Sequence, residues 1–190
     1  MKDKGLLVVI SAPSGGGKTT IIRRVLETGD ADFKYSVSVT TRPRRPDEVD
    51  GRDYFFWDLE TFERKREQGE FIEWAEVHGD FYATPRSHLE QWLQEGKTVL
   101  LDLDVHGGLE IKRLYGPSAL LIFIKPPSLG SLVERLKSRN TEDTQQIGRR
   151  LQRFPEEMQK AASYNFQILN EDLSATVAQV LKIIEQRKKN

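Results

Sequence analysis

The sequence predicts an α/β fold in which a parallel sheet carries helices on both faces and two smaller lobes are inserted. Three observations support this fold class. Short, mostly apolar runs recur along the chain, amphipathic stretches separate them, and the middle of the chain contains short β-like pieces instead. Strands that alternate with helices are typical of a parallel sheet covered on both faces. Ligands of such sheets bind beyond the carboxyl ends of the strands.

Four apolar runs predict the core strands. They do not alternate with polar residues, as expected of strands buried on both faces. These strands are expected at Leu6–Ile10, Val99–Leu101, Leu120–Ile124 and Phe166–Leu169. The amphipathic segments predict helices at Thr19–Glu27, Leu109–Leu114, Leu129–Lys137 and Leu173–Arg187.

The segment from Lys34 to about Tyr82 predicts a small inserted α+β lobe. Its β-like pieces surround one charged helix, and Val77–Phe81 resembles a hairpin turn. The pieces are Tyr35–Val39, Tyr54–Trp57 and Ile72–Val77, and the helix is Leu59–Gln68. A second insert, from about Leu129 to Arg150, is expected to be an arginine-rich pair of helices.

Composition limits the partners of the protein. The 190 residues include 29 Lys and Arg and 29 Asp and Glu, so no overall field attracts nucleic acid or an anionic membrane. The absence of cysteine excludes disulfides, thiolate catalysis and cysteine-based zinc sites, and the three histidines lack the spacing of metal ligands. The apolar run Leu6–Ile10 is too short for a signal-peptide core or a membrane span. We therefore expect a cytoplasmic enzyme that binds neither nucleic acid nor membranes.

The strongest motif is a glycine-rich loop between the first predicted strand and the first predicted helix. Glycines allow backbone N–H groups to turn toward phosphate oxygens, and the helix directs the positive end of its dipole at the same anion. Lys18 is expected to reach the β- and γ-phosphates of ATP, and the Thr19 hydroxyl to complete a Mg²⁺ shell. Ala12 stands where Gly is usual, a change that removes no phosphate ligand. The predicted ATP-binding residues here are Ala12, Pro13, Ser14, Gly15, Gly16, Gly17, Lys18, Thr19 and Thr20.

Two further features fit a phosphate-binding enzyme. Asp102 directly follows the apolar run Val99–Leu101, which is where a magnesium-orienting carboxylate is expected in this architecture. Thr19 and Asp102 are therefore the predicted Mg²⁺ residues. Four arginines also lie within eleven residues, at Arg42, Arg44, Arg45 and Arg52. Arginine binds phosphate in fork geometry, although a solvated arginine-rich loop is the alternative.

Over essentially its whole length the sequence resembles the guanylate kinases. The matching segments occur in the same order: the phosphate loop, Ser38–Arg42, Glu48–Tyr54, Phe71–Trp74, Leu101–Asp104, Pro126–Ser128 and Leu169–Asp172. The resemblance implies transfer of the terminal phosphate of Mg-ATP to GMP. It also implies a core of residues 1–35, 89–128 and 151–190, a GMP-binding lobe of residues 36–88 and a lid of residues 129–150.

The resemblance assigns roles to individual residues. It implies that the GMP phosphate is held by Arg42, Arg45, Tyr54 and Tyr82, and that guanine is read by Ser38, Glu73, Thr84 and Asp104. It places Arg135, Arg139 and Arg150 around the ATP phosphates, as catalytic residues together with Lys18 and Arg42, and Asn170 near the adenine. Arg149 and Arg153 match no family position and are expected on the surface.

The chemistry of guanine agrees with a carboxylate at position 73. Guanine presents its N1–H and 2-amino groups as donors, which suit Glu73, whereas the N1 acceptor of adenine would be repelled. The chain departs from the family pattern at Asp47, Ala83, His106 and Asn140. Ala83 is the departure nearest the expected guanine site, and we expect it to alter affinity more than the identity of the base.

Two alternatives are weighed against a guanylate kinase. One is a non-catalytic module of related fold that binds peptides, against which the intact phosphate loop argues. The other is a P-loop kinase of a different phosphorylated acceptor, against which Ser38, Glu73 and Asp104 argue. A homo-oligomer and the use of dGMP beside GMP stay open.

Overall fold

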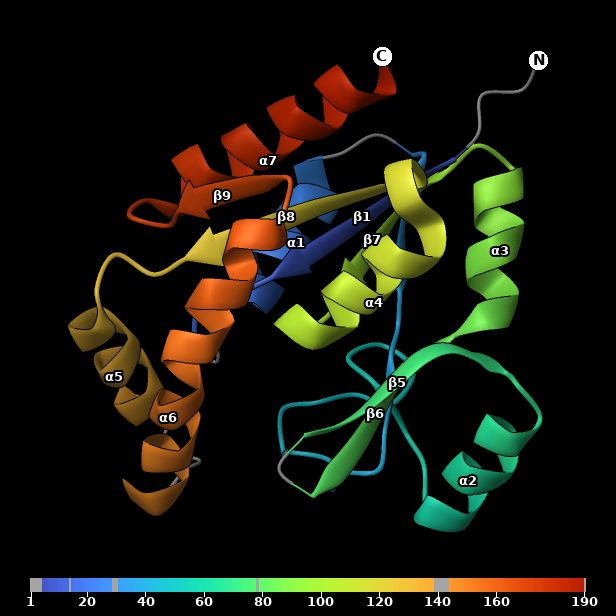
Figure 1. Ribbon diagram of the computed structural model, residues 1–190, viewed down its shortest axis with the longest axis horizontal. Coiled ribbons are helices and arrows are strands. Elements are labelled where there is room, and N and C mark those ends of the chain that lie inside the picture. Colours follow the sequence, from blue (N-terminus) through green and yellow to red (C-terminus); the bar gives the residue numbers. More distant parts are fainter. Residues whose placement is uncertain (1–4, 14, 29–30, 78, 139–143, 190) are drawn as a thin grey trace.

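A five-stranded parallel sheet forms the centre of the computed structural model, which describes residues 5–13, 15–28, 31–77, 79–138 and 144–189 (Figure 1). The strand order is β2-β7-β1-β8-β9. The bounds are β1 Leu6–Ser11, β2 Phe33–Ser36, β7 Thr98–Asp102, β8 Ala119–Lys125 and β9 Phe166–Leu169. Every neighbouring pair is parallel, so all carboxyl ends meet at one edge of the sheet.

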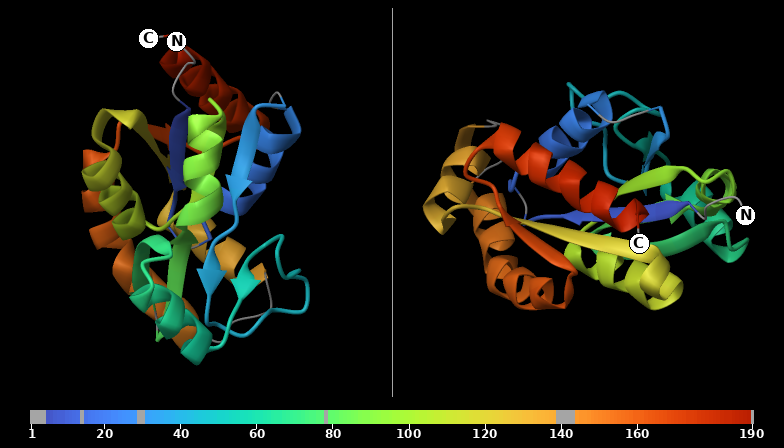
Figure 2. Two further views of the ribbon diagram at one scale, coloured as in Figure 1. Left: turned by 90° about the vertical axis from the view of Figure 1, so that its right-hand side faces the viewer. Right: turned by 90° about the horizontal axis from the view of Figure 1, so that it is seen from above.

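Helices cover both faces of this sheet, as seen from the side and from above in Figure 2. Val8 and Ile10 of β1 pack into a cluster with α1 (Lys18–Thr28) and α7 (Leu173–Lys188). Leu7 and Val9, on the other side of the same strand, pack with α3 (Arg86–Gln94) and α4 (Val105–Tyr115). All four β1 side chains are fully buried, which explains the absence of alternation in this apolar run.

A second, four-stranded sheet forms the small lobe beside the carboxyl edge of the core. Its order is β4-β3-β6-β5, and β5 and β6 form the expected antiparallel hairpin. The bounds are β3 Val39–Thr40, β4 Phe55–Phe56, β5 Phe71–Val77, β6 Asp80–Pro85 and α2 Leu59–Glu67. Phe62 of α2 is fully buried against this sheet. The remaining helices, α5 (Leu129–Ser138) and α6 (Thr144–Lys160), lie together on the opposite side of the carboxyl edge (Figure 1).

Several elements differ from the sequence-based expectation. The predicted strand Tyr35–Val39 is two strands in different sheets, because the chain crosses from the core to the small lobe after Ser36. Helix α3 was not predicted. Helix α4 starts four residues before Leu109 because the Asp104 carboxylate caps it, accepting from Gly107 N at 2.8 Å.

Helix α6 differs most in its consequences for the site. It continues to Lys160, ten residues beyond the predicted end of the lid at Arg150. It therefore joins the predicted lid to the core as one continuous helix, and it brings residues after Arg150 toward the carboxyl edge of the sheet.

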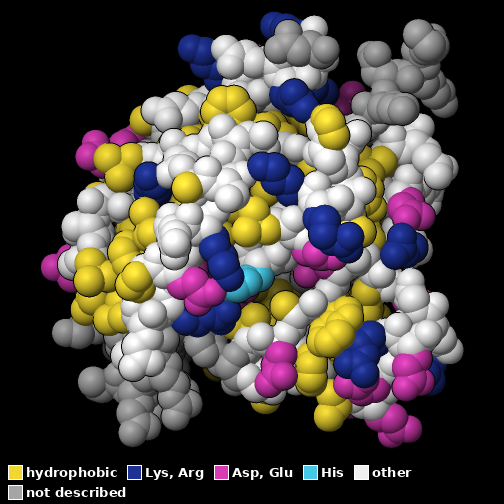
Figure 3. All heavy atoms as spheres, in the orientation of Figure 1, with side chains coloured by type: hydrophobic (Ala, Val, Ile, Leu, Met, Phe, Trp, Pro, Cys, Tyr) yellow, Lys and Arg dark blue, Asp and Glu magenta, His cyan; other side chains and the backbone are white. Residues whose placement is uncertain are grey.

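The surface agrees with the balanced composition. Figure 3 shows acidic and basic side chains interspersed on the face turned toward the viewer. Of the helices in the part of the chain that the structure describes, none has the length and apolar character needed to cross a membrane.

Close packing at Gly108 gives a stability prediction. A Cβ there would lie 2.0 Å from the Tyr164 hydroxyl and 3.2 Å from Val9 Cγ1. The hydroxyl is held by donation to Ser11 Oγ at 2.7 Å, so it cannot retreat without losing a buried hydrogen bond. We expect Gly108→Ala to lower the free energy of unfolding by about 1–3 kcal/mol, despite the better helix propensity of Ala.

Urea unfolding at constant pH measures this effect. The matched control is Gly148→Ala in α6, where, among the described residues and apart from the helix's own adjacent backbone, no atom lies within 4 Å of the added Cβ. The control should be about 0.5–1 kcal/mol more stable than wild type. If both variants gain stability alike, the packing of Tyr164 against α4 is not as tight as described.

Candidate active site

A cavity of about 240 Å³ lies between the core sheet, the small lobe and α6. It brings together predicted residues as far apart in sequence as Ala12 and Asp104, and the phosphate loop and the arginine-rich segment share it. The predicted residues that line it are Ala12, Pro13, Gly15, Gly16, Gly17, Lys18, Thr19, Ser38, Arg42, Arg45, Tyr54, Glu73, Tyr82, Asp102 and Asp104.

The glycine-rich loop has the geometry that its sequence predicts. Gly15 and Gly17 have φ values of 84° and 89°, in the left-handed region that favours glycine. At Gly16, whose N–H donates to Pro13 O at 2.8 Å, a Cβ would lie only 2.9 Å from that oxygen. The loop leads directly into α1, whose first N–H groups and dipole favour an anion. Ser14 lies outside the described residues.

Lys18, Thr19 and Asp102 meet beside this loop. Lys18 Nζ lies 2.6 Å from Asp102 Oδ1 and donates to Leu103 O at 2.8 Å. Thr19 Oγ1 donates to Asp102 Oδ2 at 3.4 Å. Parallel pairing of Ile10 with Asp102 explains the proximity, because β1 and β7 end side by side.

The oxygens of Thr19 and Asp102 fit a Mg²⁺ site. Both are hard ligands, and proteins commonly hold this ion with one or two carboxylates plus the substrate's phosphates. In the described ranges no three His, Asp or Glu side chains form a metal-binding group, so a cage made of protein ligands alone is not found there.

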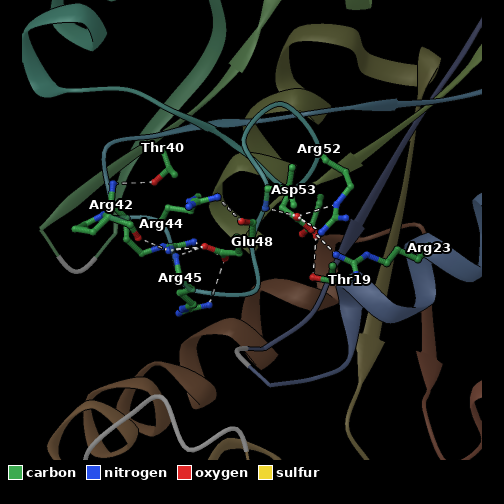
Figure 4. A network of polar contacts seen from close by, with 12 residues as sticks. Thr19, Arg23, Thr40, Arg42, Arg44, Arg45, Glu48, Arg52 and Asp53 are labelled. Atoms are coloured by element: carbon green, nitrogen blue, oxygen red, sulfur yellow. Dashed lines mark hydrogen bonds and ion pairs between the residues drawn. The ribbon is translucent and has the colours of Figure 1, made fainter.

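The arginine-rich segment is organised by Glu48, as Figure 4 shows. Arg42 donates from both terminal nitrogens to the Glu48 carboxylate, at 2.8 and 3.0 Å, and the backbone N of Arg45 donates to it at 2.8 Å. Burial would raise the pKa of Glu48, but the hydrogen bonds from Arg42 and Arg45 lower it below its ordinary value. Glu48 is therefore an anion that orients the guanidinium of Arg42, a role that was not predicted from the sequence.

Two tyrosines complete this side of the cavity. The Arg42 guanidinium lies 5.5 Å from the centroid of the Tyr54 ring, and the Tyr54 and Tyr82 rings meet edge to face at 6.0 Å. Burial raises the pKa of Tyr54 above its ordinary value, so its phenol keeps its proton at neutral pH and can donate a hydrogen bond.

Glu73 and Thr84 face each other across the β5–β6 hairpin, opposite the phosphate loop. The side chain of Glu73 is buried, and Thr84 Oγ1 donates to its Oε1 at 2.6 Å. Burial raises the pKa of Glu73 to about 7; the nearby charge of Asp104 adds to this effect and the hydrogen bond from Thr84 opposes it. Thr84 thus holds one oxygen of Glu73, which leaves the other for a partner.

Ser38 and Asp104 lie on the same side of the cavity. Ser38 Oγ is buried and has no hydrogen-bond partner in the described part of the chain. A buried hydroxyl on a cavity wall without a protein partner is available to bond a ligand. Asp104 uses Oδ1 to cap α4 and presents Oδ2 toward Arg153, at 3.9 Å.

The expectation that Arg153 lies on the surface is wrong. Its side chain lines the cavity, together with that of Glu157 one turn further along α6. Burial raises the pKa of Glu157 to about 7, and the charge of Arg153 opposes this shift. The prediction rested on the lack of a matching family position; helical periodicity within α6 places residues 153 and 157 on one face.

Asn170 occupies a different position from the other predicted residues. It is buried, its Nδ2 donates to Gly16 O at 3.1 Å, and its Oδ1 accepts from Thr176 Oγ1 at 3.2 Å. Its side chain thus supports the phosphate loop, and the predicted adenine contact stays a prediction. Thr20 is exposed on α1.

The lid arginines fall on residues that are not described. Arg135 and Arg150 belong to α5 and α6, but their side chains lie outside the described part of the structure. Arg139 and Asn140 lie outside it altogether. The roles of the three lid arginines therefore remain predictions.

The parallel α/β core and the loop with its Lys18–Asp102 pair define a P-loop nucleotide-binding fold with an inserted lobe rich in anion-binding side chains. The family model for guanylate kinase matches residues 4–187. The chain belongs to the guanylate kinase family.

Individual relatives agree with the family model. The guanylate kinase of Salinibacter ruber is 46% identical over 187 residues, which cover 98% of both chains. That of Symbiobacterium thermophilum is 43% identical over 187 residues, 98% of this chain and 88% of the relative. The crystal structure of a guanylate kinase from Anaplasma phagocytophilum matches with a TM-score of 0.82 at 33% identity, covering 100% of this chain and 89% of the other. The fold class and the family resemblance inferred from the sequence are confirmed.

Proposed function

We propose that the protein transfers the γ-phosphoryl group of ATP to the 5′-phosphate of GMP, producing ADP and GDP. One observation carries this proposal. A single cavity joins a phosphate loop to a buried carboxylate, Glu73, and an unpartnered buried hydroxyl, that of Ser38. A phosphorylated purine with two donors and one acceptor on its edge would satisfy both groups while its phosphate faces the loop.

The base is recognised by side chains that are already fixed before binding. Glu73 accepts from guanine N1–H and the 2-amino group through the oxygen that Thr84 does not occupy. The Ser38 hydroxyl donates to O6, and Asp104 stands beside the amino group. Adenine would place its N1 lone pair against the Glu73 carboxylate, which excludes it by repulsion.

The acceptor phosphate is held apart from the base, by Arg42, Arg45, Tyr54 and Tyr82. Glu48 keeps the Arg42 guanidinium aimed before the nucleotide arrives, which reduces the ordering that binding requires. The hydrogen bonds that Arg42 donates to Glu48 also raise the pKa of Arg42, against the effect of burial, so its charge is permanent.

Phosphoryl transfer here needs no general base, because the acceptor phosphate is already largely ionised near neutral pH. Catalysis then consists of aligning the γ-phosphate of ATP with the phosphate of GMP and offsetting their negative charge. Lys18 supplies one cation at the loop, and Arg135, Arg139 and Arg150 are proposed to supply others. The lobe of residues 36–88 and the lid of residues 129–150 are proposed to close over the substrates and exclude water.

Thr19 and Asp102 would hold the Mg²⁺ that accompanies ATP, directly or through its waters. When bound, the ion offsets charge on the β- and γ-phosphates. The chain supports the site by placing the Thr19 hydroxyl and the Asp102 carboxylate 3.4 Å apart beside the loop.

Asp102→Asn is expected to raise the Mg²⁺ concentration for half-maximal activity about 10- to 100-fold at fixed ATP, because the site loses its only described carboxylate. A Mg²⁺ titration of the initial rate measures this shift. Glu185→Gln, an exposed change on α7, is the control and should leave the titration unchanged. An unaltered titration in a folded Asp102→Asn protein would remove Asp102 from the metal site.

Acceptor choice is tested by a coupled assay of ADP release with GMP, dGMP, AMP, CMP, UMP and a sugar phosphate. We expect GMP to give the highest kcat/KM, with AMP weaker by orders of magnitude. ADP release that is fastest with another acceptor would indicate a different P-loop kinase. Absence of release with every acceptor, in a protein that binds GMP, would support a binding module instead.

A further inference from the structure

Arg153 lines the cavity at a position where no motif predicted a functional residue. Its side chain is 27% exposed, and its terminal nitrogen lies 3.9 Å from Asp104 Oδ2. Helix α6, which carries it, runs from the predicted lid into the core beside the start of α4 (Figure 1). The ion pair therefore connects the helix of the lid to the residue that begins α4.

Asp104 has two oxygens with two different partners. Oδ1 accepts from Gly107 N at 2.8 Å and so fixes the carboxylate to the helix terminus. Oδ2 is directed at Arg153 and toward the cavity. The hydrogen bond from Gly107 fixes Oδ1, and the Arg153 charge, 3.9 Å from Oδ2 without a hydrogen bond, attracts the second oxygen and so favours one orientation of Asp104.

Negative charge accumulates on this side of the cavity. Glu73, Asp104 and Glu157 all line it. Lys18, the cation of the phosphate loop, is paired with Asp102 at 2.6 Å and has a smaller effect on Glu157 than Arg153 has. Arg153 acts on both Asp104 and Glu157, the latter one turn along the same helix, so it is the guanidinium placed to offset this local charge.

We propose that Arg153 is a positioning residue for acceptor recognition: its guanidinium holds Asp104 in the orientation that faces the base and offsets the charge that Asp104 presents to Glu73. This inference rests on the proposed function, since it assigns Asp104 and Glu73 to the base of GMP. It differs from a phosphate-binding role, because Arg42, Arg45, Tyr54 and Tyr82 line the acceptor-phosphate side and Glu48 orients Arg42 there.

Steady-state kinetics of Arg153→Met and Arg153→Lys test the proposal. We expect Arg153→Met to raise KM for GMP about tenfold, the usual effect of losing one charge-assisted contact, with kcat and KM for ATP within about twofold of wild type. Arg153→Lys keeps the charge and should recover most of the loss. The control is Lys160→Met, which removes a cation from the same helix at a site paired with Glu156 outside the cavity.

A pH profile separates positioning from a merely structural role. The groups that face Glu73 are Thr84 from β6 and Asp104 and Glu110 at the start of and within α4. Without Arg153 the Asp104 charge acts more strongly on Glu73, so the pH below which kcat/KM for GMP declines should move upward in Arg153→Met. It should not move in Arg153→Lys or Lys160→Met.

The outcomes are decisive in either direction. An unchanged KM for GMP and an unchanged profile in Arg153→Met overturn the proposal, as does a loss confined to kcat, which would make Arg153 a phosphate ligand. Thermal unfolding of each variant shows whether it is folded, and Arg153→Lys remains informative where Arg153→Met is not. If wild type does not phosphorylate GMP, the proposed function fails; if it does and Arg153→Met matches it, only this inference fails.

Discussion

Replacing Lys18 with Ala is expected to lower kcat at least about 10²- to 10³-fold while the fold survives. A preorganised donor aimed at developing charge typically contributes a factor of this size. Lys18 Nζ lies at the end of β7 beside the phosphate loop, where Asp102 Oδ1 at 2.6 Å and Leu103 O at 2.8 Å hold it. The ammonium group of Lys18 is thus fixed before ATP binds. Removing this group takes away stabilisation of the transition state, and no neighbouring residue that the structure describes replaces it.

The kinetics of Lys18→Ala should be compared with those of Lys182→Ala, an exposed change on α7. Initial rates at saturating ATP and GMP give kcat, and circular dichroism with thermal unfolding reports on the fold. The control should retain wild-type turnover. Near wild-type turnover in a folded Lys18→Ala protein would contradict the assignment of Ala12–Thr19 as a catalytic phosphate loop.

The sequence was sufficient where local chemistry and strand ends determine the site. Residues 15–17 need glycine for reasons of backbone geometry, and Asp102 follows a strand that pairs in register with β1. The glycine positions and the place of Asp102 after an apolar run can both be read directly from the sequence. The apolar runs likewise predicted the core strands: β1, β7 and β8 are covered on both faces, whereas Phe166–Leu169 forms the edge strand β9, in which Ile168 alone is buried.

Contacts between distant elements could not be predicted in the same way. Arg153 reaches Asp104 only because α6 continues unbroken past Arg150, and helix length within a lid depends on tertiary packing. The missing partner of Ser38 is a property of the folded cavity. Asn170 is separated by 154 residues from the Gly16 carbonyl that it supports, a distance across which sequence spacing carries no information.

Replacing Glu73 with Gln is expected to weaken GMP binding by roughly 30- to 150-fold, equivalent to about 2–3 kcal/mol for a lost charge-assisted pair in a closed pocket. Thr84 Oγ1 donates to Oε1 of Glu73 at 2.6 Å, and it would hold the amide oxygen of Gln in the same place. The amide NH₂ would then face the cavity and meet the N1–H and 2-amino donors of guanine. Discrimination against AMP should shrink, because the repelling carboxylate is gone.

The same substitution should reveal the cost of burying this carboxylate. The pKa of Glu73 is about 7 in the folded protein and 4.5 when unperturbed, so the unfolded chain releases its proton first as pH rises. Ionisation therefore reduces stability progressively from about pH 4.5 to about pH 7 and no further above that. Relative to wild type, nucleotide-free Glu73→Gln should gain about 3 kcal/mol in unfolding free energy between about pH 4 and about pH 9.

Kinetics and denaturation together isolate the role of Glu73. In wild type, kcat/KM for GMP should fall as pH drops through about 7, since a protonated Glu73 is a poorer acceptor, whereas Glu73→Gln should lack this transition. ATP binding measured without acceptor should be nearly unchanged, because the phosphate loop lies on the other side of the cavity. Glu76→Gln, an exposed change on the same strand, controls for a general loss of charge on the hairpin. If GMP kinetics of Glu73→Gln match wild type, Glu73 does not read the base, and guanine recognition must depend on Ser38 and Asp104.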